Sequence, residues 1–423
     1  MEPRHFSKNS MNTDFDIVIV GGGAAGIVAA RRRAAGHDST LLIEASDRLG
    51  GRARTENAAG LSLDLGCGWL HSADRNAWAA IAEGSGFAVD RRKPAWGVQY
   101  RGLGFAPDQH VSARQALDAW KRRLAQTPPA TDCAADALAS GCEWNTYIRA
   151  MGGFISGARL ERISAKDFAA YDTAATTCNW RVPAGYGELV VRSLPPTIAR
   201  RLSTSAQAIE LDANGVRVVT PAGPVRARAA IVTVSTSVLA GTSIRMPAAL
   251  DTWRHAATLL PLGENEKLFL EVTGNNPFDP ETQVLGNPRD VRSGAYYIRP
   301  FGWPVIECFL GGEGARMMAE DGAEAGFAHA FDELAVLFGS DVRRVVRPLI
   351  ASGWSRNQHI GGAYSCALPG HAGAREMLAR QFDDRIFFAG EATHGFDFST
   401  AHGAQVSGVR AAEQAIALRR VFN

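Results

Sequence analysis

The chain has 423 residues, more than the roughly 250–300 over which one hydrophobic core usually grows, so we expect two domains. Its composition, 46% hydrophobic and 21% charged, is that of an ordinary globular protein and excludes a disordered or fibrous class. Lys and Arg (45) nearly balance Asp and Glu (43), so the net charge of +2 provides no overall field for nucleic acid or an anionic membrane.

The six cysteines and the N-terminus exclude further classes. The cysteines form no C-x-x-C pair and no paired Cys/His spacing, which argues against a metal site and against a disulfide framework. We expect inert thiols in a reducing cytoplasm. Residues 1–11 are interpreted as a loose extension, and we find no signal peptide and no membrane span.

The first predicted elements form a βαβ unit. Residues 15–20 are a short apolar run rich in β-branched residues, typical of a buried parallel strand, which stops at three glycines. A helix of small residues follows through about residue 35, and a second strand is expected at 39–44. This order is that of a Rossmann-type domain.

The turn after the first strand carries a dinucleotide fingerprint, with Gly21, Gly23 and Gly26 at G-x-G-x-x-G spacing. The first glycine permits a tight turn, the second lets backbone N–H groups approach a pyrophosphate, and the third lets helix and strand pack closely. Glu44 ends the second strand, where it can accept hydrogen bonds from the adenosine ribose. A glycine-rich turn without a ligand is the alternative, which the complete context disfavours.

The rest of the chain predicts two interleaved domains. Residues 76–174 are interpreted as an inserted, largely helical region. Strand signals return near 206–236 and at 267–272, followed by a helical pattern at 314–338 and a final buried strand at 385–390. We predict an α/β protein with a Rossmann-type cofactor-binding domain (12–75, 175–240 and 350–423) and a substrate-binding domain of mixed sheet plus helices (76–174 and 241–349).

The residues after the second strand distinguish FAD from NAD, which share the ADP moiety. Residues 47–55, with Gly51 and Arg52, resemble the R-x-G-G-R segment of the FAD-dependent amine oxidase superfamily. The resemblance implies arginines that meet the diphosphate and flavin-side oxygens. A solvated basic loop is the alternative for Arg48 and Arg54.

Three more segments are similar to polyamine oxidases and flavin-dependent histone demethylases. Residues 64–71 resemble the D-L-G-x-x-W-[IL]-H segment that lines the isoalloxazine ring. Lys267 resembles the family lysine that holds a water near flavin N5, with an exposed strand lysine as the alternative. Trp354 and Tyr364 match a run in which Trp packs near the flavin and Tyr lines the substrate cavity. Ala363 stands where monoamine oxidases carry their flavin-linking cysteine, which implies non-covalent FAD.

Residues 390–404 resemble the last flavin segment of the family, G-E-x-T…T-x-H-G-A. A helix beginning there would aim its N-terminal N–H groups at flavin O2 and stabilise negative charge on the reduced ring. The chain departs from the family at the second aromatic wall, because Asp397 or Thr400 stands where relatives have a tyrosine. Phe398 is a candidate for that wall, and a core position is the alternative.

The resemblance implies a flavoprotein of the amine oxidase and glutathione reductase type that oxidises a small-molecule amine. Hydride passes from the substrate α-carbon to flavin N5, the product is an imine, and O2 is reduced to H2O2. A desaturase-like or protoporphyrinogen-oxidase-like C–C dehydrogenase and a non-catalytic flavin-loaded binding module are the alternatives. The identity of the amine and the oligomeric state, including a homodimer, are left open.

The candidate site residues follow from these motifs. Lys267 and Tyr364 are the candidate catalytic residues. The candidate substrate contacts are His71, Tyr364 and Phe398, with Asp397 as a further polar contact. The candidate cofactor-binding residues are Gly21, Gly23, Ala25, Gly26, Glu44, Ala45, Gly51, Arg52, Gly66, Cys67, Gly68, Trp69, Ala206, Trp354, Gly390, Glu391, Thr400 and Ala401.

Overall fold

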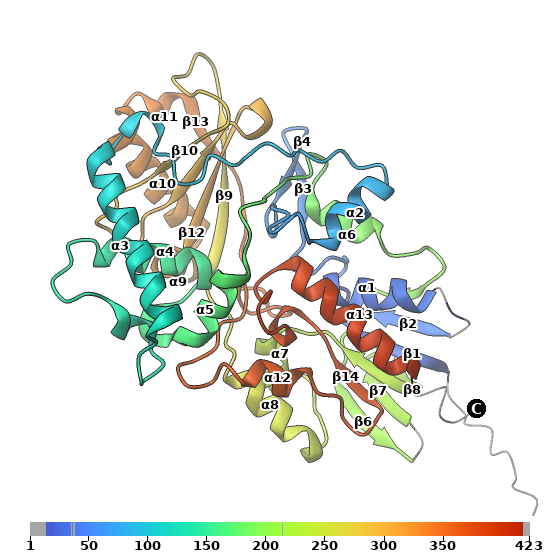
Figure 1. The fold of residues 1–423 in the computed structure, drawn as a ribbon. Helices are drawn as coiled ribbons and strands as arrows, with labels where there is room; N and C mark the ends of the chain where they lie inside the picture. Colours follow the sequence, from blue (N-terminus) through green and yellow to red (C-terminus); the bar gives the residue numbers. More distant parts are fainter. Residues whose placement is uncertain (1–13, 35, 37–38, 214, 418–423) are drawn as a thin grey trace, which may run out of the picture.

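Two large β-sheets organise the chain, one at the lower right of Figure 1 and one at the upper left. The structure is a computed structural model that describes residues 14–417 except 35, 37, 38 and 214. The extension predicted at 1–11 lies outside these residues. Within the described part of the chain, no helix is both long and apolar enough to cross a membrane.

The first sheet has seven strands in the order β5-β2-β1-β8-β7-β6, with β14 also paired to β8. β1 pairs in parallel with β2 and β8, whereas β6, β7 and β8 pair antiparallel. The strands are β1 (Phe15–Val20), β2 (Thr40–Ile43), β5 (Ala199–Arg201), β6 (Ala208–Asp212), β7 (Gly215–Thr220), β8 (Gly223–Val232) and β14 (Ile386–Phe388).

Helices cover both faces of this sheet, which explains the continuous apolar run of β1. Ile17 and Ile19 belong to one hydrophobic cluster, while Val18 and Val20 belong to the cluster on the opposite face. The helices of the first cluster are α1 (Ala24–Ala34), α2 (Ala77–Gly84), α6 (Tyr186–Arg192) and α13 (Ala401–Ala417). Those of the second are α7 (Thr236–Ala240), α8 (Asp251–Thr258) and α12 (Ala374–Ala379).

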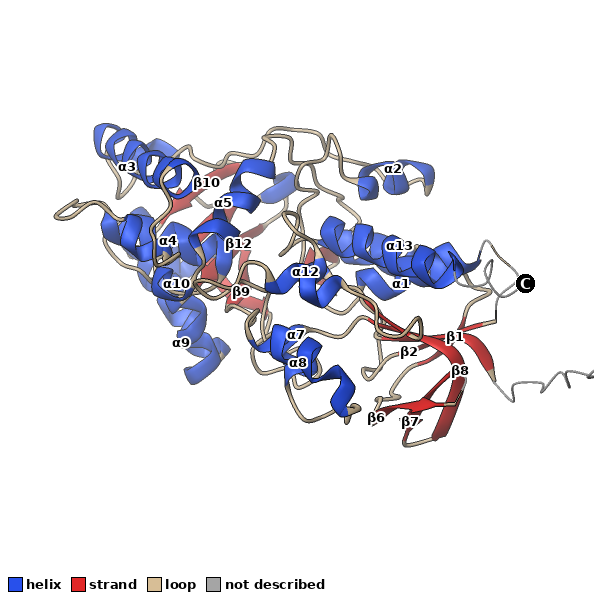
Figure 2. Ribbon diagram, turned by 60° about the horizontal axis from the view of Figure 1, so that its bottom comes forward, coloured by secondary structure: helices blue, strands red, loops and turns tan. Residues whose placement is uncertain are grey.

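The first and last helices of the domain lie against each other, as Figure 2 shows for α1 and α13. Their backbones approach so closely that a Cβ added to Gly408 would lie 2.3 Å from the carbonyl oxygen of Ala25. Glycine is therefore required at this crossing.

The second sheet is antiparallel throughout, in the order β10-β11-β12-β9-β13. Leu268 and Leu270 of β9 pack beneath α9, α10 and α11, so the alternate residues, among them Lys267, point to the other face. The elements are β9 (Asn265–Val272), β10 (Thr282–Leu285), β11 (Ala295–Ile298), β12 (Val305–Gly311), β13 (Val346–Ala351), α9 (Glu313–Asp321), α10 (Ala323–Phe338) and α11 (Val342–Val345).

The region 76–174 is largely helical, as the pattern predicted, and its longer helices form a cluster of their own beside the second sheet. These are α3 (Pro107–Gln126), α4 (Asn145–Ser156) and α5 (Ala165–Ala174). A hairpin of β3 (Thr55–Ala58) and β4 (Leu61–Asp64) and short 3₁₀ helices at 100–102, 134–137, 160–162, 248–250, 300–302 and 391–393 complete the described elements.

Candidate active site

One cavity of about 950 Å³ is lined by residues of both sheets and by segments from all along the chain. Its volume is at the upper end of the roughly 300–1,000 Å³ typical of ligand pockets, enough for a large cofactor beside a small substrate. The predicted site residues that line it are Gly21, Gly23, Ala25, Glu44, Ala45, Gly51, Arg52, Gly66, Cys67, Gly68, Trp69, His71, Ala206, Lys267, Trp354, Tyr364, Gly390, Glu391, Thr400 and Ala401.

The glycines of the first turn are set as a dinucleotide requires. Gly21 has φ +110, and a Cβ there would lie 2.6 Å from the Thr233 hydroxyl. A Cβ on Gly26 would lie 2.0 Å from the Gly21 carbonyl oxygen, so Gly26 serves packing and does not line the cavity. At Gly23 the nearest atom to an added Cβ is 4.0 Å away, which leaves open space against the start of α1. That space has room for a phosphate at the helix N-terminus.

Glu44 lies at the end of β2 and is fixed by backbone donors. One carboxylate oxygen accepts the Gly22 N–H at 2.6 Å and the other accepts the Ser46 N–H at 2.8 Å. A carboxylate has about four lone-pair sites, so both oxygens keep capacity for the hydroxyls of a ribose. Glu44 lines the same end of the cavity as the glycine turn, and these residues fit the ADP half of FAD.

The basic loop after β2 is ordered by its own arginines. Arg48 donates to the carbonyl oxygens of Leu49 and Gly51, at 3.2 and 3.0 Å, so it shapes the loop. Arg52 lines the cavity and donates to the Ala363 carbonyl oxygen at 2.5 Å and to Glu391 at 3.0 Å. Arg52 therefore ties the loop to both C-terminal motifs.

Lys267 is buried and lines the cavity. The alternative interpretation, that Lys267 is an exposed lysine on a strand, is therefore excluded. Its ammonium group lies 2.8 Å from a carboxylate oxygen of Glu307 and donates to the Asp64 carbonyl oxygen at 3.1 Å. Lys267 is opposite Phe309 in the β9/β12 ladder, so Glu307 is its diagonal neighbour on the same face. Glu307 belongs to no recognised motif and was not predicted, although strict alternation along β12 would have placed it beside Phe309 on that face.

Aromatic side chains form the walls of the cavity at the end that holds Lys267. This end of the cavity is called the chamber below. Trp69 contacts Trp96, with ring centroids 4.4 Å apart, and Tyr297, with centroids 5.7 Å apart. Tyr364 donates to the Phe154 carbonyl oxygen at 2.5 Å, which fixes its ring against α4. Trp96 and Tyr297 lie in regions without a recognised motif, so the sequence analysis did not identify them.

His71 lies in this chamber as a neutral base. Its ring Nδ1 is 2.8 Å from the side-chain oxygen of Asn179, and burial lowers the pKa of His71 to about 4. The ring therefore remains uncharged at physiological pH and can hydrogen-bond a substrate without repelling it.

Phe398 and Asp397 lie elsewhere than predicted. Phe398 is outside the cavity lining; its ring lies 5.6 Å from Tyr171 and 3.5 Å beneath the Arg375 guanidinium. Tyr171 of α5 lines the cavity instead. Asp397 forms two 2.6 Å contacts with Arg75 and lies 3.1 Å from His402, so its carboxylate is held within the protein and is also outside the lining.

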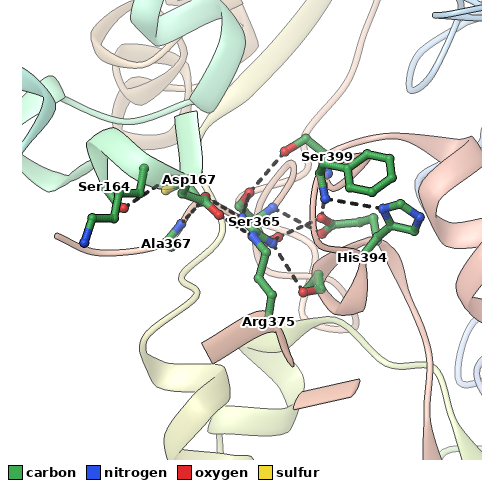
Figure 3. A network of polar contacts seen from close by, with 12 residues as sticks. Ser164, Asp167, Ser365, Ala367, Arg375, His394 and Ser399 are labelled. Carbon is green, nitrogen blue, oxygen red and sulfur yellow. Dashed lines mark hydrogen bonds and ion pairs between the residues drawn. The ribbon is translucent and has the colours of Figure 1, made fainter. Parts of the chain in front are cut away.

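A buried polar network supports the C-terminal flavin motif, and Figure 3 shows Arg375 between Asp167 and Ser365. Arg375 donates to both oxygens of Asp167 at 2.6 and 2.8 Å and to the Ser365 hydroxyl at 2.8 Å. That hydroxyl donates to Glu391 at 2.7 Å, and Glu391 pairs with Arg52. Basic and acidic side chains thus alternate from α5 to the cavity.

Comparison with known proteins identifies the family of the chain. A family model described as flavin containing amine oxidoreductase matches residues 24–416. Polyamine oxidase 3 of Oryza sativa subsp. japonica is 26% identical over 410 residues, covering 88% of this chain and 83% of the relative. Polyamine oxidase 2 of Arabidopsis thaliana is 26% identical over 424 residues, covering 88% and 82%.

A shorter match extends to another enzyme group. Lysine-specific histone demethylase 1 homolog 1 of Oryza sativa subsp. japonica is 30% identical over 127 residues, which cover 29% of this chain and 15% of the relative. The match to the family model spans nearly the whole chain, from the start of α1 through the Lys267 strand to the C-terminal segment. The chain therefore belongs to the flavin-containing amine oxidoreductases, and it is an FAD-dependent enzyme that acts on C–N donors.

Proposed function

We propose that the protein oxidises a C–N bond of a small amine to an imine, using O2 and releasing H2O2. The observation that carries this proposal is the buried ammonium group of Lys267, placed where the aromatic chamber meets the segment 64–71. When bound, FAD would supply the chemistry: N5 as the acceptor for the hydride of the substrate α-carbon, and the electrons that reduce O2.

The residues of the chain bind, orient and exclude water. Gly23 and the start of α1 hold the diphosphate, and Glu44 holds the ribose. Thr400 and Ala401 line the cavity at the start of α13, where the N-terminus of this helix would stabilise negative charge. Residues 12–75, 175–240 and 350–423 would form this Rossmann-type FAD-binding domain, with 76–174 and 241–349 as the substrate-binding domain.

Lys267 positions a water molecule through its N–H donors, since Glu307 and Asp64 account for two of the three. The aromatic walls orient the substrate C–H bond, and Tyr364 forms part of them. The neutral ring of His71 accepts or donates a hydrogen bond to the amine. These roles favour oxidation of an amine over oxidation of a C–C bond, because Lys267 and His71 are polar groups at the end of the cavity where the substrate would react.

Non-covalent attachment of FAD follows from the thiols near the cavity. Ala363 offers no sulfur, and Cys67, which lines the cavity, has a pKa that burial raises far above the usual thiol value. A thiol that stays protonated is a poor nucleophile. We propose a cytoplasmic enzyme from which acid releases intact flavin.

The experiment that tests this function is anaerobic mixing of the purified holoenzyme with amines, followed by exposure to O2. We expect an amine to bleach the absorbance of the oxidised flavin. O2 should then restore that absorbance, with one H2O2 released per flavin reoxidised. A flavin that no amine reduces would contradict the proposal. Lys267→Met should impair the cycle, whereas Lys93→Met, at an exposed lysine, serves as the matched control.

A further inference from the structure

The charged groups of the substrate chamber are all neutralised within the protein. Apart from Glu44, Arg52 and Glu391, which belong to the cofactor motifs, the charged Lys, Arg, Asp and Glu side chains that line the cavity are Lys121, Lys267 and Glu307. Lys267 pairs with Glu307 at 2.8 Å, and Lys121 of α3 pairs with Asp172 of α5 at 2.6 Å. Among the described residues, the chamber walls thus present no carboxylate without its own cation.

The aromatic rings of the chamber walls already contact a cation of the protein itself. Arg181 lies 5.0 Å from the ring centroid of Trp69 and 5.2 Å from that of Tyr297. It is almost fully buried and pairs with Asp90 at 2.6 Å and Glu281 at 2.8 Å. Because a cation on a ring draws on the same negative quadrupole that would attract a substrate ammonium, these rings favour an uncharged partner.

The far end of the chamber offers a neutral hydrogen-bonding group. Gln283 of β10 lines the cavity, and its side-chain oxygen is buried without a hydrogen-bond partner among the described residues. Between Gln283 and Lys267 lie strands β11 and β12, so three inter-strand spacings of roughly 4.8 Å separate the two backbones by about 14 Å. A buried acceptor at that distance calls for a donor on the substrate.

From these features we infer that the substrate is a long apolar amine with one basic nitrogen, at the Lys267 end, and a neutral hydroxyl or amide donor at the Gln283 end. The inference rests on the proposed amine oxidation. It separates this protein from its polyamine oxidase relatives, because a second ammonium in this chamber would be buried without a counter-charge.

An α-amino acid is excluded by the same reasoning. Among the described cavity-lining residues Arg52 is the arginine, and it is held by Glu391 and the Ala363 carbonyl oxygen. Because the family resemblance assigns Arg52 to the flavin, no second arginine of this described lining is left to fork onto a substrate carboxylate.

The test compares three substrates of equal length that differ only at the far end: nonylamine, α,ω-aminooctanol and α,ω-diaminooctane. Flavin reduction by the holoenzyme is followed anaerobically for each. We expect the diamine to have at least about 100-fold lower kcat/KM than nonylamine, since its tail enters only as the minor neutral form. The aminooctanol should exceed nonylamine by about 3–10-fold, the worth of one hydrogen bond.

Two outcomes of this substrate comparison would overturn the inference, and they are distinguishable. A diamine that is used as well as nonylamine refutes the neutral chamber but leaves amine oxidation intact. A flavin that none of the three reduces, nor any other amine, refutes the proposed function and the inference with it.

The pH dependence gives a second readout. Between roughly pH 7 and 9 each pH unit makes the neutral diamine tail tenfold more abundant, because alkyl ammonium groups titrate near ~10.4. The ratio of kcat/KM for nonylamine to that for the diamine should therefore fall about tenfold per unit. A ratio that does not change with pH would overturn the charge argument.

Two variants test the residues themselves. Lys121→Met leaves the Asp172 carboxylate unpaired beside the chamber, so the diamine should gain at least about tenfold relative to nonylamine, as expected for a new charge pair of about 1.4 kcal/mol. Lys121→Arg keeps the charge and should keep the wild-type ratio. Gln283→Leu should reverse the preference for aminooctanol over nonylamine. An unchanged ratio in Lys121→Met or Gln283→Leu counts against the inference.

Discussion

Replacing Arg375 by methionine should destabilise the protein and weaken its hold on FAD. The side chain is buried, with 2% of its surface exposed, and donates five hydrogen bonds, two to Asp167, two to Ser365 and one to the Ala392 carbonyl oxygen. Methionine retains much of the apolar volume over Phe398 but leaves the Asp167 carboxylate buried without its partner.

The magnitude follows from that uncompensated charge. Removing one partner of a buried ion pair costs about 3–5 kcal/mol. At roughly 2 cal/mol/K of unfolding entropy per residue, 423 residues give about 0.9 kcal/mol/K, so Tm should fall by about 3–6 °C. Because Ser365 links Arg375 to Glu391, FAD should dissociate faster from this variant as well.

The assay is a double-mutant cycle on the holoenzyme, with flavin fluorescence reporting release of FAD on heating. The cycle contains Arg375→Met, Asp167→Asn and the double variant, which restores charge balance. The double variant should lose less stability than the sum of the single losses, by about 1–3 kcal/mol. A single variant within about 1 °C of wild type, or strictly additive losses, would refute the reasoning.

Three further predictions concern the cavity. Glu44→Ala should weaken FAD binding by about 1.5–3 kcal/mol, the value of a hydrogen bond to a charged group, measured by titrating FAD into apoprotein; unchanged affinity would count against the ribose contact. Lys267→Met should slow flavin reoxidation at least about tenfold in stopped flow, with Lys93→Met as control, and a change below about twofold would remove its catalytic role. Burial lowers the pKa of His71 from 6.5 to about 4, so between these pH values the unfolded chain binds a proton at His71 that the folded chain does not bind. The free energy of unfolding should therefore fall as the pH drops from 6.5 to about 4. His71→Gln should flatten this part of a Tm–pH curve, and an unchanged curve would refute the assignment.

Features set by local sequence could be predicted. The turn at Gly21 and the position of Glu44 depend on a strand, a glycine turn and the next strand, all adjacent in the chain. Lys267 was found through its resemblance to a family segment, and the structure places it in the cavity with them. Short-range chemistry was enough for these positions.

Residues that depend on long-range pairing could not be predicted. Glu307 meets Lys267 only because β12 pairs with β9 in one register, and Lys121 and Tyr171 reach the cavity through the packing of α3 and α5. Asp397 was predicted as a substrate contact because it stands where relatives have a tyrosine. Its actual partner, Arg75, is 322 positions away in the chain, so local sequence does not reveal the pairing. Phe398 follows in the same irregular loop, where no periodicity indicates which side chain points inward.

The crossing of α1 and α13 has a consequence for biosynthesis. Helix α1, which follows the glycine turn, completes its packing only with residues of α13, far along the chain. At ~5–20 residues per second, the ribosome would hold the N-terminal βαβ unit for roughly 20–80 s before α13 emerges. During that time the apolar surface of α1 lacks its partner, so FAD should join a finished chain rather than a nascent one, and a shortage of flavin would leave completed apoprotein to the quality-control machinery.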